Sequence, residues 1–151
     1  MDEELFEKAE TAAARLLKFR QTKRAFREKL RRKGFPADIV EAVTEKAERL
    51  GSINDEDYAA AFVHDSVLLN RYGKIKVMKS LLQKGISRDI AENALSMFDD
   101  EIYFDNLRYF ANKSFDLEGD VSSDDIEHFR KKMLARGYTF RQIESFLECG
   151  L

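Results

Sequence analysis

One short pattern occurs three times in this 151-residue chain at almost constant spacing. Each copy holds two apolar residues four positions apart, followed by a basic residue, a glycine and another apolar residue. The glycines are Gly34, Gly85 and Gly137, which lie 51 and 52 residues apart. A fixed period of about fifty residues is typical of a tandem array, in which each structural unit packs mainly against its neighbours.

Each glycine follows a basic turn and marks the end of a helix, because glycine readily adopts the left-handed conformation that stops one. A helix start comes next in all three copies: Pro36 at the first helical position, Ser87 as an N-cap, and Thr139 with Gln142 as a capping box. A longer helical stretch precedes each copy; in the second, it is expected to run from an Asn54 cap to Leu69. The repeating unit is therefore predicted to contain three helices.

The sequence thus predicts an all-α fold, a tandem array of three three-helix repeats that forms an elongated, curved rod with three small apolar cores. The predicted units are residues 1–53, 54–98 and 99–151. Helical packing is expected to continue across the short joints between them. An acidic insertion near 115–123 in the third unit is expected to form a mobile loop.

Composition disfavours several other classes of protein. One proline and seven glycines are too few turn residues for a β-sandwich or barrel, whereas 36% charged residues suit helices with wide solvated faces. No apolar run approaches the roughly 20 residues that span a bilayer, and the acidic start lacks the basic region of a signal peptide. We therefore expect a soluble, cytoplasmic protein with no membrane contact.

The net charge of -2 conceals an uneven distribution of cations. Residues 15–33 include ten basic residues and one acid, and segments 71–84 and 130–141 each include five basic residues and no acid. Most of these cations fall on the middle helix of each unit, so stacking is expected to align them in a basic stripe. Such a stripe attracts nucleic-acid phosphates or an acidic protein surface. The plainer interpretation is that each charged face is merely solvated.

Sequence-specific reading of duplex DNA by a helix-turn-helix is disfavoured. The 36–50 helix, which would enter the major groove, carries four acids against two cations, and these acids would oppose the phosphates. Looser binding through the middle helices is compatible with the charges. Tyr72, Tyr103 and Tyr109, which lie near basic residues in the sequence, are candidates for stacking on unpaired bases.

No catalytic or metal-binding pattern is found. His64 and His128 have no second histidine or cysteine at ligand spacing, and Cys149 has no disulfide partner. The acidic run 99–101 is better explained as a helix start, because consecutive side chains point in different directions around a helix. We expect neither an enzyme nor a cofactor or metal site.

Three segments, taken together, resemble the RecX family of bacterial recombination regulators. They are LRRKGFPADIVEAV from Leu30 to Val43, NDEDYAAAFV from Asn54 to Val63, and YGKIKVMKSLLQKGI from Tyr72 to Ile86. The resemblance covers roughly residues 13–151 and rests on the order and spacing of the segments. It implies a non-enzymatic modulator of RecA that lies in the groove of the RecA filament on single-stranded DNA. From there, it would inhibit ATP hydrolysis, strand exchange and co-protease activity.

The resemblance and the charge pattern together define an expected contact surface. The expected partner-binding residues are Arg20, Lys23, Arg24, Arg27, Arg31, Arg32, Arg71, Lys74, Lys76, Lys79, Arg130 and Lys131. The expected partner is the RecA filament, with single-stranded DNA as a further candidate, and the chain is expected to be a monomer. Two alternatives stay open: a helical-repeat scaffold that docks another acidic protein, and a weak non-specific nucleic-acid binder. The mildly acidic overall charge favours protein contact as the main source of affinity.

Overall fold

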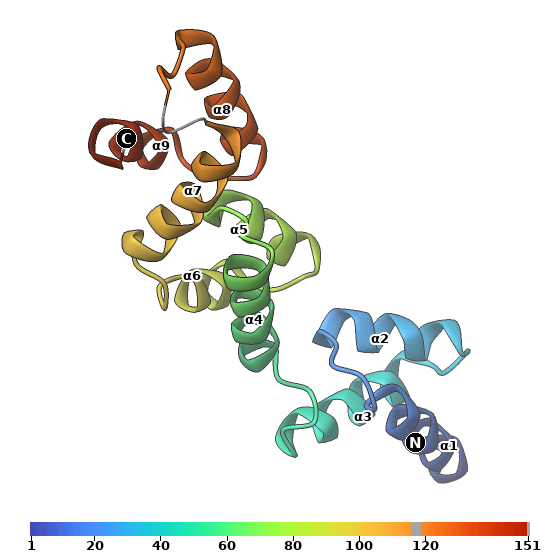
Figure 1. Cartoon of the computed structure of the whole chain (residues 1–151). Coiled ribbons are helices and arrows are strands. Elements are labelled where there is room, and N and C mark those ends of the chain that lie inside the picture. The colour runs from blue at the N-terminus through green and yellow to red at the C-terminus, as the bar shows by residue number, and fades with distance from the viewer. Residues whose placement is uncertain (116–118, 151) are drawn as a thin grey trace.

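The computed structural model describes residues 1–115 and 119–150, which fold into helices joined by short connections (Figure 1). No strand occurs within these ranges. The elements are α1 (Glu3–Leu16), α2 (Lys23–Arg32), α3 (Ala37–Arg49), α4 (Asp55–His64), the π-helix η1 (Asp65–Leu69), α5 (Lys74–Gln83), α6 (Arg88–Leu95), α7 (Asp100–Ser114), α8 (Ser123–Ala135) and α9 (Phe140–Gly150).

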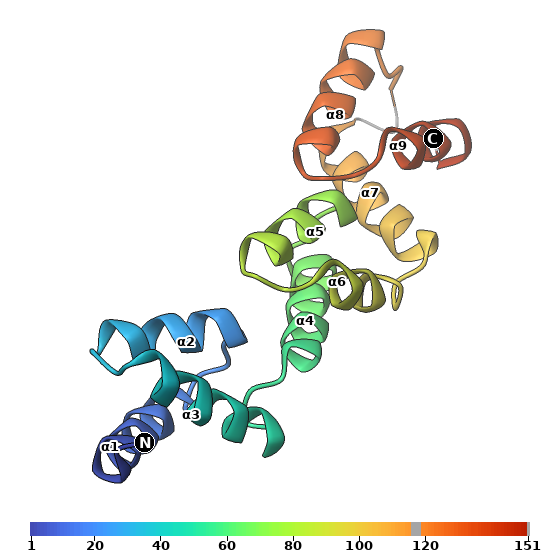
Figure 2. The same ribbon diagram turned by 180° about the vertical axis from the view of Figure 1, so that it is seen from behind.

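The elements form an elongated array of three three-helix units, which confirms the fold predicted from the sequence. We call α1–α3 the first repeat, α4–α6 with η1 the second, and α7–α9 the third. In two opposite views, the first repeat lies at one end, the second in the middle and the third at the other end (Figures 1 and 2).

The helix ends follow the predicted local signals. Gly34, Gly85 and Gly137 all adopt positive φ, at 95°, 88° and 98°, directly after the middle helix of each repeat. The predicted capping box is present, since Gln142 N donates to Thr139 Oγ1 at 3.0 Å and Thr139 N donates to Gln142 Oε1 at 3.1 Å.

Three local predictions need correction. Pro36 is the N-cap of α3 rather than its first helical residue. The helix capped by Asn54 does not stay α-helical to Leu69, because a π-helix replaces it from Asp65 onward. In the first repeat, apolar residues recur at helical spacing from Leu5 to Phe19, which predicts that the first helix reaches Phe19. Instead, Phe19 lies beyond the end of α1 and is 76% exposed.

Among the residues that the structure describes, the apolar core forms two clusters rather than the three expected. One cluster belongs to the first repeat and is built around Phe26, Leu30 and Ile39. The other is continuous through the second and third repeats and joins residues such as Leu81 and Phe129. Apolar packing therefore crosses the second joint, between α4–α6 and α7–α9, but the two clusters stay separate at the first joint, between α1–α3 and α4–α6.

The expected acidic loop at 115–123 lies partly outside the described residues, because 116–118 are not described. On either side of that gap, Phe115 is buried in the core, and Ser122 caps α8. Within the described part of the chain, no helix is long and apolar enough to cross a membrane.

Candidate partner-binding surface

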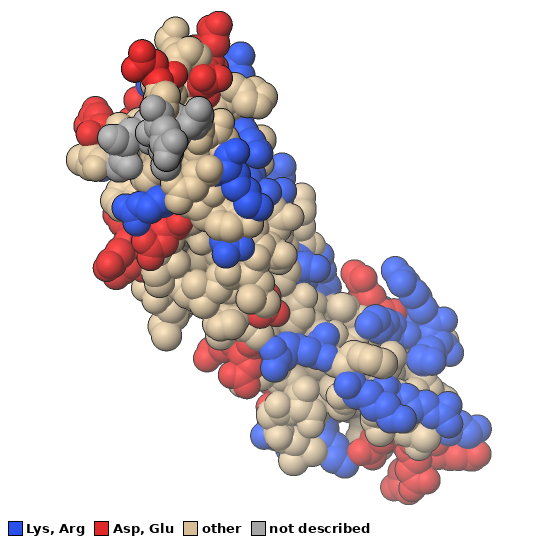
Figure 3. Space-filling view, viewed as in Figure 1, with Lys and Arg blue, Asp and Glu red and all other residues tan. Residues whose placement is uncertain are grey.

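The expected contact residues lie mainly on the middle helices, α2, α5 and α8. Arg20 precedes α2, and Arg71 lies in the connection between η1 and α5. In the face seen in Figure 3, Lys and Arg side chains follow one flank of the molecule from α8 past α5 to α2. The array thus brings cations from all three repeats to a shared flank.

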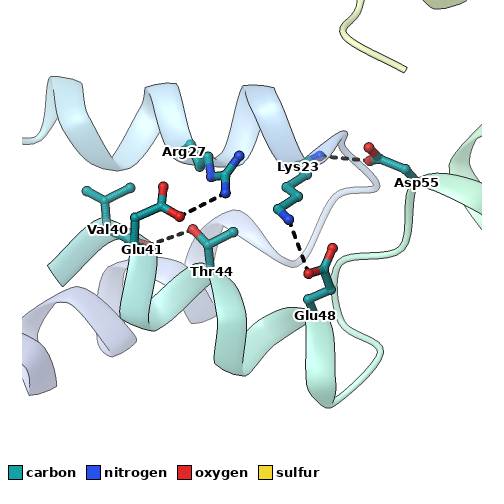
Figure 4. A network of polar contacts seen from close by, with 7 residues as sticks. All are labelled: Lys23, Arg27, Val40, Glu41, Thr44, Glu48 and Asp55. Carbon is teal, nitrogen blue, oxygen red and sulfur yellow. Dashed lines mark hydrogen bonds and ion pairs between the residues drawn. The ribbon is translucent and has the colours of Figure 1, made fainter. Parts of the chain in front are cut away.

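Carboxylates neutralise two of the expected cations in the first repeat. Lys23 Nζ lies 3.1 Å from Glu48 Oε1, and Arg27 Nη2 lies 2.8 Å from Glu41 Oε2 (Figure 4). Both carboxylates belong to α3, so these contacts fasten α2 to α3. Lys23 and Arg27 are therefore structural residues in this conformation, with little charge left for a partner.

The same ion pair recurs in the third repeat. Arg130 lies 2.5 Å from Glu144 through Nε, and a second bond of 3.1 Å joins Nη2 to the other carboxylate oxygen. The hydrogen bond to Glu144 raises the pKa of Arg130 above its usual range. Arg27 and Arg130 both lie seven residues before the repeat glycine, and their glutamates lie seven after it. This spacing could have revealed the pair from sequence.

The other nine expected cations have no carboxylate within ion-pair distance among the described residues. They are Arg20, Arg24, Arg31, Arg32, Arg71, Lys74, Lys76, Lys79 and Lys131.

At the first joint, polar side chains connect the repeats. The amide of Lys23 donates to Asp55 Oδ1 at 2.9 Å, and Arg24 Nη2 donates to the Gln83 carbonyl at the end of α5. Beside these contacts is a groove of about 370 Å³, lined in part by Arg20 and Lys84. The connection depends on flexible side chains rather than on apolar packing.

At the second joint, the backbones themselves are in contact. Gly73 N donates to the Arg136 carbonyl at 2.9 Å, and Ile75 N donates to the Gly137 carbonyl at 3.0 Å. The start of α5 is thereby capped by carbonyls at the end of α8, an arrangement that also aligns the two helix dipoles favourably. A Cβ on Gly73 would overlap the Gly137 backbone, so this approach requires glycine.

Two buried tyrosines reinforce the second joint. Tyr103 and Tyr138 pack edge to face with ring centroids 6.3 Å apart, and Tyr138 OH donates to the Arg71 carbonyl at 2.7 Å. Burial raises the pKa of the Tyr103 phenol to about 12 and also raises the pKa of Tyr138. Both phenols therefore stay neutral to a higher pH than an exposed tyrosine does.

Next to the second joint, aromatic rings rather than carboxylates hold the cations. Tyr109 has the Arg71 guanidinium 3.8 Å and the Lys113 ammonium 4.5 Å from its ring centroid. Tyr72 has Lys76 at 4.2 Å and Arg136 at 4.7 Å. Phe110 has Arg136 at 4.4 Å and Lys132 at 5.8 Å. We call this set the cation–ring surface: Arg71, Lys76, Lys113, Lys132 and Arg136 with Tyr72, Tyr109 and Phe110.

Sequence reasoning found part of this surface and missed the rest. It singled out Arg71 and Lys76 as cations and Tyr72 and Tyr109 as candidate stacking residues. Lys113, Lys132 and Arg136 were not among the expected contacts. Lys132 and Arg136 are counted among the five cations of segment 130–141, and Arg136 also marks a helix end, but neither is singled out as a contact residue. Tyr103, the third candidate stacking residue, is 2% exposed and therefore belongs to the core.

The residues considered for catalysis, His64, His128 and Cys149, belong to three different helices, α4, α8 and α9. His64 and His128 are exposed on helices, with His64 Nδ1 3.1 Å from Asp65 Oδ1, and Cys149 is exposed near the end of α9. The described residues contain no group of three or more His, Cys, Asp or Glu side chains that could hold a metal ion.

Comparison with known proteins identifies relatives of this chain. The sequence model described as "RecX, second three-helix domain" matches residues 54–95. The chain is 30% identical to "Regulatory protein RecX" of Prosthecochloris aestuarii, with coverage of 84% of this chain and 82% of that protein. It is also 30% identical to the protein of the same name from Clostridium acetobutylicum, covering 85% of this chain and 61% of the relative. Against the first clostridial relatives, the chain spans between 55% and 66% of their length.

Solved structures agree on the fold. The crystal structure of RecX from Lactobacillus salivarius superposes with a TM-score of 0.90 at 23% identity, covering 96% of each chain. A second crystal structure of a regulatory protein RecX gives a TM-score of 0.84 at 21% identity, covering 95% of this chain and 72% of the other. The sequence relationship and the shared fold lead to one conclusion: this chain belongs to the RecX family of regulatory proteins.

Proposed function

We propose that this chain regulates RecA by binding its filament on single-stranded DNA. It lies in the helical groove of the filament and from there inhibits ATP hydrolysis, strand exchange and co-protease activity. It acts in the cytoplasm, as a monomer and without chemistry of its own. Membership of the RecX family supports this proposal, as does a long array that offers an extended face to a partner.

The observation that carries the proposal is the cationic flank spanning all three repeats. On α2, α5 and α8 there are exposed cations that have no acidic partner in residues 1–115 and 119–150, for example Arg31, Lys79 and Lys131. Single exposed charges contribute little, but a continuous row of one sign raises the rate and specificity of docking to an acidic surface. A filament groove bounded by protein and DNA provides a partner of that shape and charge.

A RecA assay tests this proposal. Purified protein is added to RecA on single-stranded DNA, and ATP turnover is followed. Inhibition is expected well below the amount needed to coat the DNA. The double variant Lys74→Glu with Lys79→Glu is expected to inhibit at least several-fold less well, because it reverses two exposed α5 charges that have no acidic partner among the residues described.

A matched control makes the same charge change elsewhere. Lys8 and Arg88 are exposed, and each is paired with a glutamate one turn away, at 3.5 Å and 4.0 Å. Their reversal to glutamate should leave inhibition close to that of the unmodified chain. No inhibition at any excess of the unmodified chain would refute RecA regulation and favour the alternative, a helical scaffold for a different acidic protein.

A further inference from the structure

Within the part of the chain that the structure describes, the cation–ring surface keeps its full positive charge. A carboxylate neutralises the cation that it holds, as Glu41 does with Arg27 at 2.8 Å. An aromatic ring attracts a cation through its quadrupole and carries no net charge, so the cation stays available to an anion. None of the five cations of this surface lies within ion-pair distance of a carboxylate in residues 1–115 and 119–150.

Two of these cations are fixed before any ligand arrives. Arg71 has a φ of 56°, a left-handed conformation that is uncommon for a residue with a side chain. It is held there by the hydrogen bond from Tyr138 OH to its carbonyl and by the stacking of its guanidinium on Tyr109. Arg136 lies between Tyr72 and Phe110, and its Nη2 donates to the Asn70 carbonyl. Strained and over-determined positions of this kind are concentrated at functional sites, and fixed side chains lower the entropy cost of binding.

We propose that the cation–ring surface binds single-stranded nucleic acid directly, with its cations on the phosphates and its tyrosine rings beside unpaired bases. Un-neutralised cations on neighbouring helices fit a chain of phosphates. Half-buried Tyr72 and Tyr109 fit bases whose faces are free, which a duplex does not offer. The inference deepens the proposed function and rests on it for its biological setting, a filament that already contains such a strand.

An oligonucleotide assay without RecA tests this surface separately. Fluorescence anisotropy of a labelled polythymidine strand is measured over a range of salt concentrations for two triple variants and the unmodified chain. Arg71 and Arg136 are left in place because they also hold the second joint. The ring variant carries Lys76→Gln, Lys113→Gln and Lys132→Gln. The control carries Lys8→Gln, Arg49→Gln and Arg88→Gln, three exposed cations that lie outside the expected contact residues.

Both variants lose three exposed cations, and only the ring variant loses cations held by rings. The unmodified chain should bind with strong salt dependence. In the ring variant, affinity at low salt should fall on the order of tenfold, and the slope of log affinity against log salt should fall by about 2, since each phosphate contact contributes roughly 0.7. The control should stay within about twofold of the unmodified chain, and a duplex of equal length should bind less tightly than the single strand.

Several outcomes would overturn the inference. Equal losses in the two variants would mean that overall charge alone attracts the strand. Tighter binding of the duplex would contradict the use of unpaired bases. RecA inhibition without oligonucleotide binding would overturn this inference and leave the proposed function intact. Oligonucleotide binding without any effect on RecA would support the surface and refute the proposed function.

Discussion

The two joints of the array use related surfaces in different ways. At each joint, the start of one middle helix faces the end of the next repeat's middle helix. At the first joint, the Arg24 side chain reaches the Gln83 carbonyl across a groove. At the second, Gly73 and Gly137 let the backbones bond directly, and one apolar core runs through both repeats. Because Gly73 and Gly137 have no side chain, the second joint closes through backbone contact and is fixed. The first joint is bridged by a flexible side chain and can adjust.

This difference has a consequence for binding. The second and third repeats form one body that holds the cation–ring surface in a fixed geometry. The first repeat carries its own core and a cationic helix on a polar joint. A rod built this way can fix one part of its contact surface while the other adapts to the pitch of a helical partner.

Alkaline pH should give the largest contrast. Tyr103 and Tyr138 are buried at the second joint with raised pKa values, about 12 for Tyr103, whereas the first repeat contains no tyrosine. A phenol with a raised pKa contributes stability that is complete below its ordinary pKa near 10 and is lost as pH rises through the folded value. We expect α4–α9 to unfold as these two phenols ionise.

Tyrosinate absorbance and circular dichroism, recorded together, check this expectation. Two of the five tyrosines should titrate late and in step with a loss of helix. Titration of all five near the ordinary pKa, with helicity unchanged, would show that the second joint does not depend on buried phenols.

The three repeat glycines provide the next contrast. All have positive φ, so alanine costs about 1–2 kcal/mol of backbone strain at each. At Gly34 an added Cβ meets nothing within 4 Å, and at Gly85 it meets the flexible Arg24 side chain, with Nε 2.8 Å away. At Gly137 it lies 2.6 Å from the backbone nitrogen of Lys76.

Urea denaturation should therefore rank Gly137→Ala as the most damaging, by about 1–3 kcal/mol beyond the Gly34→Ala baseline, because the backbone cannot move aside cheaply. Gly85→Ala should stay within about 1 kcal/mol of that baseline. If Gly85→Ala costs as much as Gly137→Ala, the first joint is as rigid as the second.

Single hydrogen bonds across the joints should differ by less. Asn106 is 7% exposed and donates to the Val67 carbonyl at 2.8 Å, so Asn106→Ala should cost about 1–3 kcal/mol by leaving a buried acceptor without a partner. Asp55→Ala removes the acceptor for Lys23 N at the first joint, where water can replace it, and should cost less than about 1 kcal/mol. Chemical denaturation of the two variants compares the costs, and a larger loss for Asp55→Ala would reverse the assignment.

The ion pairs within the repeats should contribute least. A double-mutant cycle on Arg130 and Glu144 should give a coupling of about 0.5–1 kcal/mol, and the more exposed pair Arg27 and Glu41 should give less. If both coupling energies are small, the joints account for the difference in stability between the first repeat and α4–α9. A coupling energy above about 2 kcal/mol for either pair would mean that ion pairs within the repeats, rather than contacts at the joints, set the difference in stability.

Much of the fold could be predicted from the spacing of the repeat glycines. Glycine at positive φ, a basic last turn and an N-cap each determine where a helix ends or begins through contacts with neighbouring residues in the sequence. The π-helix could not be predicted, since a single extra residue per turn leaves no clear apolar period. The close approach of Gly73 to Gly137 could not be predicted from the sequence, because only Gly137 belongs to the repeated pattern. Local sequence does not specify which residues meet across a joint.

The candidate site was predicted less completely for a similar reason. The cation clusters of α2 were found by counting charges along the chain. Whether a cation is neutralised depends on its neighbour from another helix: Glu41 lies beside Arg27, whereas Tyr109 lies beside Arg71. The cluster at 15–33, the strongest in the sequence, is therefore partly neutralised, whereas no carboxylate in the described part of the chain pairs with a cation of the weaker cluster at 71–84.

Native-state hydrogen exchange in low urea, read amide by amide, tests the two-body account most directly. We expect core amides of α4–α9, with those of Gly73 and Ile75, to open together at one high free energy, and the core amides of α1–α3 to open separately at a lower one. A single opening free energy shared by all three repeats, or early exchange at Gly73 and Ile75, would contradict the account.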